Sequence, residues 1–198
     1  AGKPAAFVNA DVALDGEPVI GSFTVDGLTY AVTDGPYVEL VGVSPSVALS
    51  EAAADGEVEG SDEGRASEAG AASLILPEAV SYAGVSHIVS SVGAYAFYLS
   101  GVTDVTLPAS VSNVDDRAFR SSDVASVAVV EGNPTYSSYD GVLYDVEHLS
   151  LLLIPEGKQG AVRIPAAAKA VPPSAFSHCA GVDAIAADAD GAAFASEN

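Results

Sequence analysis

Apolar and polar positions alternate over short stretches of the chain, and the stretch around residues 102–122 shows the pattern most clearly. Val105 and Leu107 flank Thr106, so their two side chains are expected to lie on the same face of a brief strand. Pro108 ends that strand, because proline cannot donate a hydrogen bond to a sheet ladder. The pattern therefore predicts a short strand that runs directly into a turn.

This sparse pattern occurs three times along the chain. The stretch "VTLPASVSNVDDRAF" at 105–119 matches "VRIPAAAKAVPPSAF" at 162–176, and a third copy spans 74–97 as "LILPEAV", an insertion and "VGAYAF". The Ala-Phe pairs at 96–97 and 118–119 are 22 residues apart, which is the length of one solenoid coil. A single coil cannot bury its own apolar side, so we expect the coils to stack on one another.

Each of the three copies closes on an alanine followed by a phenylalanine. The alanine is small enough to let neighbouring coils approach, and the phenylalanine can fill the space between them. We therefore predict that Phe97, Phe119 and Phe176 form a column of rings through the stack. An aromatic ligand box is the alternative interpretation, and the repeated position of the rings favours the column.

Hairpin signals appear outside the repeats. Residues 5–50 read as short strands, and "FTVDGLTY" places Asp26-Gly27 between two alternating runs, which is the strongest short-range signal of a two-residue turn. "YDGVLY" repeats the signal at Asp140-Gly141. Residues 51–72 are acidic, rich in glycine and alanine and without a period, so they predict a loop or linker.

The chain divides accordingly into two parts. Residues 1–73 are expected to form an antiparallel β cap over the first coil, and an independent small domain is the alternative. Residues 74–198 are expected to hold the coils, interrupted by an inserted β-hairpin at 131–145. The chain contains no methionine and stops at "AAFASEN" without a terminating feature, so we expect a fragment whose stack is truncated at the C-terminus.

Composition narrows the classes of partner. The chain has 27 acidic and 7 basic residues and a formal net charge of −20. Nucleic acid and anionic lipid both require Lys and Arg to replace counterions, so we expect neither as a partner. No run of 18 apolar residues is present, which predicts no membrane span. Solubility explains the acidity most simply; a basic partner, a cation-rich surface or a halophilic source are the alternatives.

Sequence signals of catalysis are missing. The patterns G-x-S-x-G, G-x-G-x-x-G, H-E-x-x-H and the P-loop are absent, and His87, His148 and His178 fall in different units. The single cysteine, Cys179, excludes an internal disulfide and a cysteine-only zinc site. His178 beside Cys179 could form half of a metal site, but a rim histidine beside a small buried cysteine is favoured. We predict no enzyme, no cofactor and no metal.

Two acidic pairs raise the question of calcium. Asp115-Asp116 and "DADG" at 188–191 offer hard oxygen ligands. A calcium loop needs several oxygens at regular alternate positions, and "DADG" supplies two acids with no distal glutamate. A solvated turn is therefore the favoured interpretation.

The open side of the predicted strands is the surface best placed to bind a partner. If Val102, Val105 and Leu107 point inward, their neighbours along the strand point outward, and small residues with scattered carboxylates line that side. Such a surface suits a broad, shallow contact with a protein or a glycan. The candidate residues on this concave face are Thr103, Asp104, Thr106, Ser126, Arg163 and Asp183.

The inserted hairpin supplies a second candidate surface. It carries Tyr136, Tyr139 and Tyr144, and tyrosine combines a large contact area with a polar tip. The alternative interpretation is that these tyrosines cover the edge of the solenoid.

The repeats and the insertion together resemble the BspA-like leucine-rich-repeat proteins of bacterial surfaces. A unit of that family reads approximately "L-x-x-I-x-I-P-x-x-V-x-x-I-x-x-x-A-F-x-x-C", and this chain reads "VTDVTLPASVSNVDDRAFRSS" at 102–122. The segment "NPTYSSYDGVLY" at 133–144 is similar to the family's "NPxYxSxDGVLY" module, and Cys179 takes the inward cysteine position. The chain departs from the pattern in using valine at the leucine positions and in having Val114-Asp115 and Val171-Pro172 where "Ile-Gly" is usual.

The resemblance implies a fold and a function. The fold is mainly β, with a right-handed leucine-rich-repeat solenoid of short parallel strands after an N-terminal antiparallel β cap with hairpins. The function is non-catalytic binding of a protein or glycan outside the cell, in adhesion or host interaction, by a secreted or surface-anchored protein. The alternatives are an accessory binding module of a larger extracellular enzyme and a spacer that holds another module off the cell surface.

Overall fold

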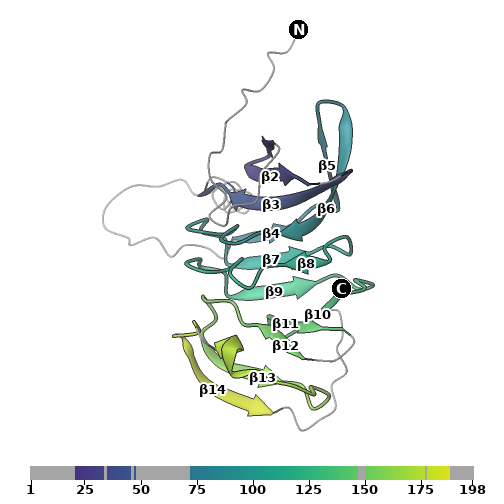
Figure 1. Cartoon of the computed structure of the whole chain (residues 1–198). Coiled ribbons are helices and arrows are strands. Elements are labelled where there is room, and N and C mark those ends of the chain that lie inside the picture. The colour runs from purple at the N-terminus through teal and green to yellow at the C-terminus, as the bar shows by residue number, and fades with distance from the viewer. Residues whose placement is uncertain are drawn as a thin grey trace, which may run out of the picture.

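The computed structural model describes residues 21–33, 35–45, 47, 72–146, 150–176 and 178–187. Within these residues the chain forms short strands that lie one above another in a stack (Figure 1). The N-terminal strands lie at one end of the stack and the C-terminal strands at the other. The predicted mainly β class is confirmed, and the strand pairing is mixed rather than uniformly parallel.

The N-terminal end is an antiparallel meander. It consists of β1 (Ser22–Val25), β2 (Leu28–Val32) and β3 (Tyr37–Val43), with β1 paired to β2 and β2 paired to β3. Asp26 and Gly27 join the first two strands with φ angles of 50° and 78°. Two successive positive φ angles suit the tight turn that "DG" predicts, so the predicted hairpin is confirmed.

A second hairpin joins this meander to the repeats. It consists of β5 (Ala79–Tyr82) and β6 (Val85–Val92), which pair in antiparallel register around Ala83-Gly84. β6 also pairs in parallel with β3 on one side and with β8 (Asn113–Val114) on the other. The N-terminal strands and the first coils therefore share one mixed sheet, because the insertion seen in the first repeat forms a strand of it.

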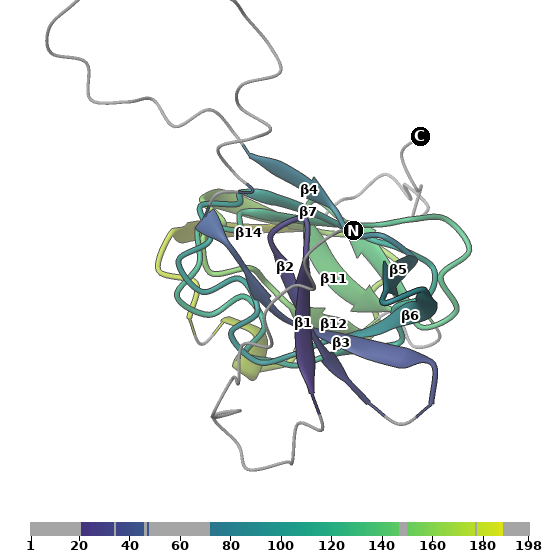
Figure 2. The same cartoon turned by 90° about the horizontal axis from the view of Figure 1, so that it is seen from above.

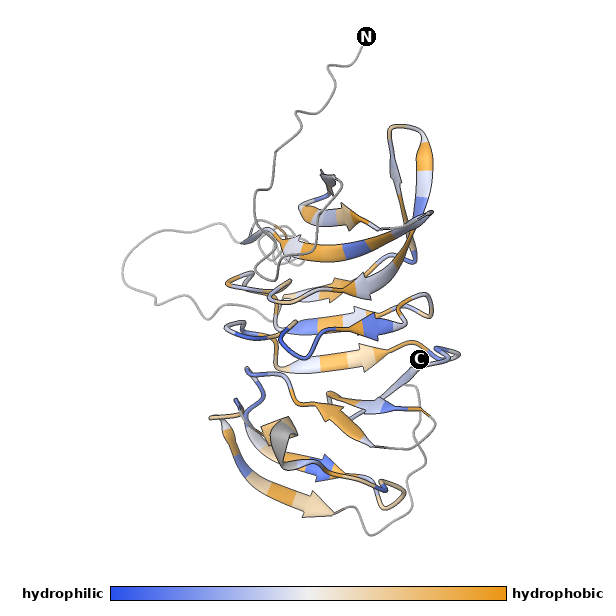
Figure 3. Cartoon of the chain, in the orientation of Figure 1, coloured by the Kyte–Doolittle hydropathy of each residue, from blue (hydrophilic) through white to orange (hydrophobic). Residues whose placement is uncertain are grey.

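A purely parallel sheet lies elsewhere on the stack. It contains β4 (Ser73–Ile75), β7 (Asp104–Leu107) and β9 (Ser126–Val129), in that spatial order. Asp104 lies opposite Ser126 in the register of β7 and β9, an offset of 22 residues that matches the predicted coil length. Apolar and polar residues alternate along β7 (Figure 3). The apolar residues of this strand are buried.

The insertion between the second and third copies forms three strands. They are β10 (Tyr136–Tyr139), β11 (Val142–Asp145) and β12 (Leu151–Leu153), paired antiparallel in that order. The β10–β11 turn is Asp140-Gly141, with φ angles of 52° and 74°, which confirms the second predicted hairpin. The segment extends past residue 145, because β12 continues the same sheet.

The C-terminal part of the described chain is a parallel pair. β13 (Gly160–Ile164) pairs with β14 (Val182–Ala187), and the short 3₁₀ helix η1 (Pro173–Phe176) lies between them in the chain. The register shifts after Gly160, so that Arg163 lies opposite Ala186.

Two hydrophobic clusters hold the stack together. The larger one contains residues from β1 through β12, so the N-terminal meander and the first two coils share a core. Phe97 and Phe119 are buried in it, with ring centroids 5.0 Å apart and an interplanar angle of 22°. Phe176 packs instead against the second cluster around Tyr144 and Val162. The predicted column of rings therefore holds for two phenylalanines and not for the third, because the three-stranded insertion occupies the space between the coils.

The turn after β12 makes a close backbone contact with the second coil. The Gly157 N–H donates to the Val124 carbonyl oxygen at 2.9 Å. A Cβ at Gly157 would lie 2.5 Å from the Asp123 carbonyl oxygen and 2.7 Å from that of Val124. Only glycine allows this approach, because a Cβ at this position would collide with backbone atoms, which cannot move aside as a flexible side chain can.

Replacing Gly157 by alanine is expected to destabilise the protein by about 1–3 kcal/mol, since the added methyl group forces the two turns apart. Gly21→Ala is the matched control, because a Cβ there meets no atom within 4 Å. We expect that control to be neutral or stabilising by up to about 1 kcal/mol. Chemical denaturation followed by circular dichroism measures both, and equal effects of the two variants would contradict the close contact.

Glu39 on β3 is a half-buried carboxylate that packs against Gly93. Burial, and then the nearby Asp115 carboxylate, raise the pKa of Glu39 above its ordinary value of 4.5. The native state therefore binds this proton more tightly than the unfolded state does. The contribution of Glu39 to stability is consequently lost as the pH rises from 4.5 through the raised pKa.

We expect the melting temperature of the Glu39→Gln variant, relative to that of the wild type, to increase as the pH rises from acid to neutral. The reason is that glutamine never becomes charged. The exposed Glu131→Gln variant removes the same charge and corrects for the change in net charge. Thermal melts across the pH range measure the difference. If the difference in melting temperature between Glu39→Gln and the wild type is constant with pH, or shrinks toward neutral pH, the surroundings do not destabilise the charged carboxylate.

Candidate binding face

The predicted inward and outward positions of β7 are confirmed. Val105 and Leu107 are buried, as is Val102 just before the strand, whereas Asp104 and Thr106 are half-exposed. Burial of alternate residues fixes the register of the strand, because a slip by one residue would turn its apolar side chains outward. The polar side chains of β7 therefore lie on the open side of the parallel sheet.

The parallel register aligns the outward side chains in two rows. One row contains Ser73, Asp104 and Ser126, and the other contains Ile75, Thr106 and Ala128. Neighbouring strands are about 4.8 Å apart, so the members of each row are adjacent. The rows are built mainly from small side chains, with one carboxylate and with an isoleucine that is 71% exposed at the sheet edge. They make a shallow surface rather than a pocket.

The Thr103 side chain is held by local hydrogen bonds. Its hydroxyl lies 2.7 Å from Asp104 Oδ2 and 3.3 Å from the Ala72 carbonyl oxygen, positioned to donate to either. The contact with Thr103 orients the Asp104 carboxylate on the face. Asp104 is thereby the better placed of the two to meet a partner.

The tip of the inserted hairpin lies between β9 and β13. The Gly141 carbonyl accepts from the Val127 N–H of β9 at 2.9 Å, and Asp140 Oδ2 accepts from the Arg163 N–H of β13 at 2.9 Å. Lys158 neutralises Asp140 in an ion pair of 3.5 Å. The turn thus links the two parallel sheets, a role that the sequence pattern did not indicate.

Arg163 and Asp183 lie on the C-terminal strand pair. Both side chains are exposed, and Asp183 falls at the register shift of β14, so it has no direct partner on β13. Seen down the stack, β14 lies on the same side of the molecule as β4 and β7 (Figure 2). The structure therefore places the six predicted residues on β7, β9, β13 and β14 or directly beside them.

The three tyrosines of the insertion differ in exposure. Tyr144 is fully buried in the second cluster, and burial followed by the Asp140 and Tyr139 charges raises its pKa to about 12. Tyr136 is half-buried, and its hydroxyl accepts from the Val114 N–H at 3.0 Å. Tyr139 is half-buried against the second cluster. These side chains fasten the insertion to the coils, and Tyr144 offers no surface to a partner.

The remaining candidate residues show ordinary structural contacts. Asp115 pairs with Arg117 at 3.2 Å; burial favours a higher pKa for this carboxyl, but the hydrogen bonds from Arg117 outweigh it and lower the pKa. Cys179 is half-buried, with Sγ 3.5 Å from the Ala175 carbonyl oxygen, and burial raises the pKa of its thiol. His148 and the "DADG" segment lie outside the described residues. Among the described residues no group of three or more His, Cys, Asp or Glu could hold a metal ion.

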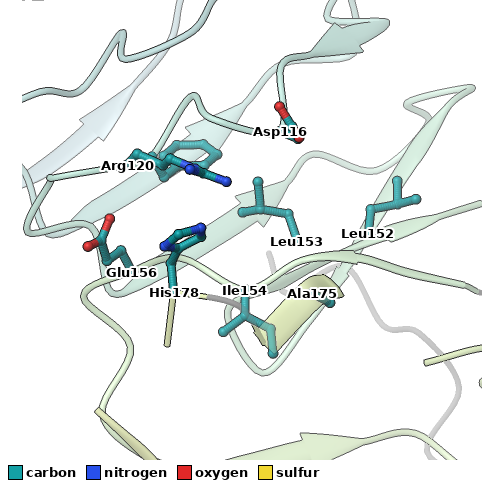
Figure 4. Close-up of a pocket in the computed structure, with 9 residues that line it drawn as sticks. Asp116, Arg120, Leu152, Leu153, Ile154, Glu156, Ala175 and His178 are labelled. Atoms are coloured by element: carbon teal, nitrogen blue, oxygen red, sulfur yellow. The ribbon is translucent and has the colours of Figure 1, made fainter. Parts of the chain in front are cut away.

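A small cleft lies apart from the open face, at the junction of the two hydrophobic clusters (Figure 4). Its volume is about 110 Å³. Arg120 comes from the turn after β8, Glu156 from the turn after β12, and His178 from the segment after η1. These residues are far apart in the chain, so no spacing in the sequence could have indicated the cleft.

The solved structures to which this chain is similar include leucine-rich-repeat proteins of bacteria. One from Bacteroides capillosus shares 18% identity over 84% of this chain and 98% of its own, with a TM-score of 0.48. One from Eubacterium ventriosum shares 23% identity over 58% of this chain and 29% of its own, with a TM-score of 0.43. A leucine-rich cell surface protein from Faecalibacterium prausnitzii shares 13% identity over 87% and 44%, with a TM-score of 0.44.

Two further comparisons give no result. No protein-family model matches the chain, and no curated protein matches it. In the part of the chain that the structure describes, no helix has both the length and the apolar character needed to cross a membrane.

Proposed function

We propose that the chain is a non-catalytic leucine-rich-repeat protein of the bacterial surface or extracellular space, which binds a protein or glycan through the open face. The observation that carries the proposal is the pair of outward rows on β4, β7 and β9, where mainly small side chains lie side by side on a parallel sheet. A rigid sheet loses little conformational entropy when a partner docks. The proposed contact residues are Thr103, Asp104, Thr106, Ser126, Arg163 and Asp183.

We infer that residues 74–198 form a right-handed solenoid and that residues 1–73 act as its cap. The larger hydrophobic cluster supports the cap, since it contains residues of both parts. An uncovered first coil would expose its apolar end to water.

An array of glycans and extracellular-matrix proteins tests the proposal. The expected result is saturable binding of at least one arrayed molecule at micromolar protein. Absence of binding at that concentration would contradict the proposal and favour a spacer that holds another module off the surface. The other rival is an accessory module of a larger extracellular enzyme, and a catalytic domain in the same full reading frame would favour it.

A further inference from the structure

The cleft at the junction of the clusters exists because of the insertion. In an uninterrupted stack the turn that carries Phe119 would lie against the turn that carries Phe176. Here β12 lies between them, and Phe119 and Phe176 belong to different clusters. The cleft has walls from both turns and from β12, so three segments that are distant in sequence meet around it.

An arginine and a histidine line one side of the cleft. Arg120 and His178 face one another there (Figure 4). The Arg120 guanidinium borders the cleft and makes no ion pair with another described residue. A carboxylate that enters the cleft would give this cation a counterion. An anion is therefore the chemistry that the site lacks, and a carboxylate suits the planar guanidinium.

The rest of the lining limits the anion to one negative charge. Asp116 and Glu156 also border the cleft, and Glu156 already accepts from the Ser121 N–H at 2.6 Å. Two nearby carboxylates repel a dianion such as phosphate more strongly than a monoanion. The remaining walls are mostly aliphatic, with Leu152, Leu153, Ile154 and Ala175, so they suit an apolar group and leave the hydroxyls of a sugar unpaired.

The size and surroundings of the cleft favour a chain end as the ligand. A water molecule needs on the order of 10–15 Å³ of such a cavity, so a volume of about 110 Å³ holds a carboxylate with a small branched side chain. Leu152 also lines a second hollow of about 260 Å³, together with Pro134, Thr135, Tyr136 and Asp145. This second hollow offers room for the residues that precede a terminal carboxylate.

We propose that this cleft binds the C-terminal carboxylate of a partner polypeptide that ends in a small branched apolar residue. Arg120 and His178 hold the carboxylate, Ile154 and Ala175 contact the terminal side chain, and Leu152 contacts the residue before it. The site contains none of the six residues of the open face. If the cleft does not bind a carboxylate, the proposed function of the open face is unaffected. If the open face binds no partner, the proposal for the cleft is likewise unaffected.

The probe is the tetrapeptide acetyl-Gly-Gly-Ala-Val with a free C-terminal carboxylate, and its C-terminal amide is the ligand-side control. We expect the amide to bind at least about tenfold more weakly, because a neutral amide gives the Arg120 guanidinium no counterion. Two-dimensional NMR titration of the full chain gives the affinity. The expected shifts map to the turn at 118–121, to 152–156 and to 175–178. Equal affinity of acid and amide, or no shifts at millimolar peptide, would overturn the proposal.

Variants and a small ligand sharpen the test. Arg120→Gln is expected to weaken binding of the acid peptide by at least about tenfold. The control Lys169→Gln removes an exposed charge elsewhere, and we expect it to change the affinity by less than about twofold. Isovalerate carries the same terminal chemistry without the preceding residues, so we expect it to bind at least about tenfold more weakly than the peptide. Unchanged binding by Arg120→Gln, or isovalerate binding as tightly as the peptide, would overturn the assignment to a polypeptide end.

Discussion

Replacing Phe97 by alanine is expected to lower the free energy of unfolding by about 3–5 kcal/mol, one of the two largest effects that we predict for a single substitution. Phe97 is fully buried and stacks on Phe119 at 5.0 Å, so the substitution removes a large apolar side chain and leaves a cavity between two coils. The stacked pair contributes on the order of 1 kcal/mol beyond its burial. Because the chain has no tryptophan, denaturant unfolding is best followed by circular dichroism.

The neighbouring residue provides the control for this prediction. Tyr98 is 55% exposed, and Tyr98→Ala is expected to change stability by no more than about 0.5 kcal/mol. Phe176→Ala is expected to cost less than Phe97→Ala, because Phe176 is only half-buried in the second cluster. Equal losses for all three variants would contradict the assignment of Phe97 and Phe119 to a shared core.

Replacing Asn133 by alanine is expected to lower the free energy of unfolding by about 3 kcal/mol or more. Asn133 is buried, and its side-chain amide donates to the carbonyl oxygens of Pro108 and Val111, each at 2.9 Å. Its side-chain oxygen accepts from the backbone N–H groups of Thr135 and Tyr136. The substitution leaves several buried polar groups without partners, and it releases the insertion from the coil beneath it.

A second asparagine makes a matched control. Asn113 is exposed at the start of β8, so Asn113→Ala is expected to change stability by no more than about 0.5 kcal/mol. Asn133→Asp keeps the shape of the side chain but presents a carboxylate to two carbonyl oxygens. We expect it to be more destabilising at neutral pH than in acid, where the protonated carboxyl can donate. A neutral effect of Asn133→Ala in denaturant titrations would show that the four hydrogen bonds contribute little.

The sequence predicted best those features that depend on residues close together in the chain. The two Asp-Gly turns form hairpins because both residues adopt positive φ, a preference that is local to the turn. The inward positions of β7 follow from alternation alone, and Asn133 is the first residue of the "NPTYSSYDGVLY" segment. The coil length of 22 residues also follows from the spacing of the Ala-Phe pairs.

The features that could not be predicted depend on how the insertion packs. The pattern around Phe176 matches that around Phe119, yet β12 separates the two rings, and the repeat pattern carries no information about what lies between repeats. The link from Asp140-Gly141 to β9 and β13, and the meeting of Arg120 with His178, likewise arise only in three dimensions. Tyr144 is fully buried, whereas Tyr136 and Tyr139 are half-buried, and nothing in the sequence distinguishes the three tyrosines of the insertion.

The open face is tested most directly by measuring the affinity of the Thr106→Tyr, Arg163→Glu double variant for the molecule that the array identifies. The control is Ser112→Tyr with Lys169→Glu, which makes the same changes in bulk and charge at exposed positions off the face. We predict that the double variant binds at least about tenfold more weakly and that the control keeps its affinity within about twofold. Unchanged affinity of the double variant would contradict binding through this face.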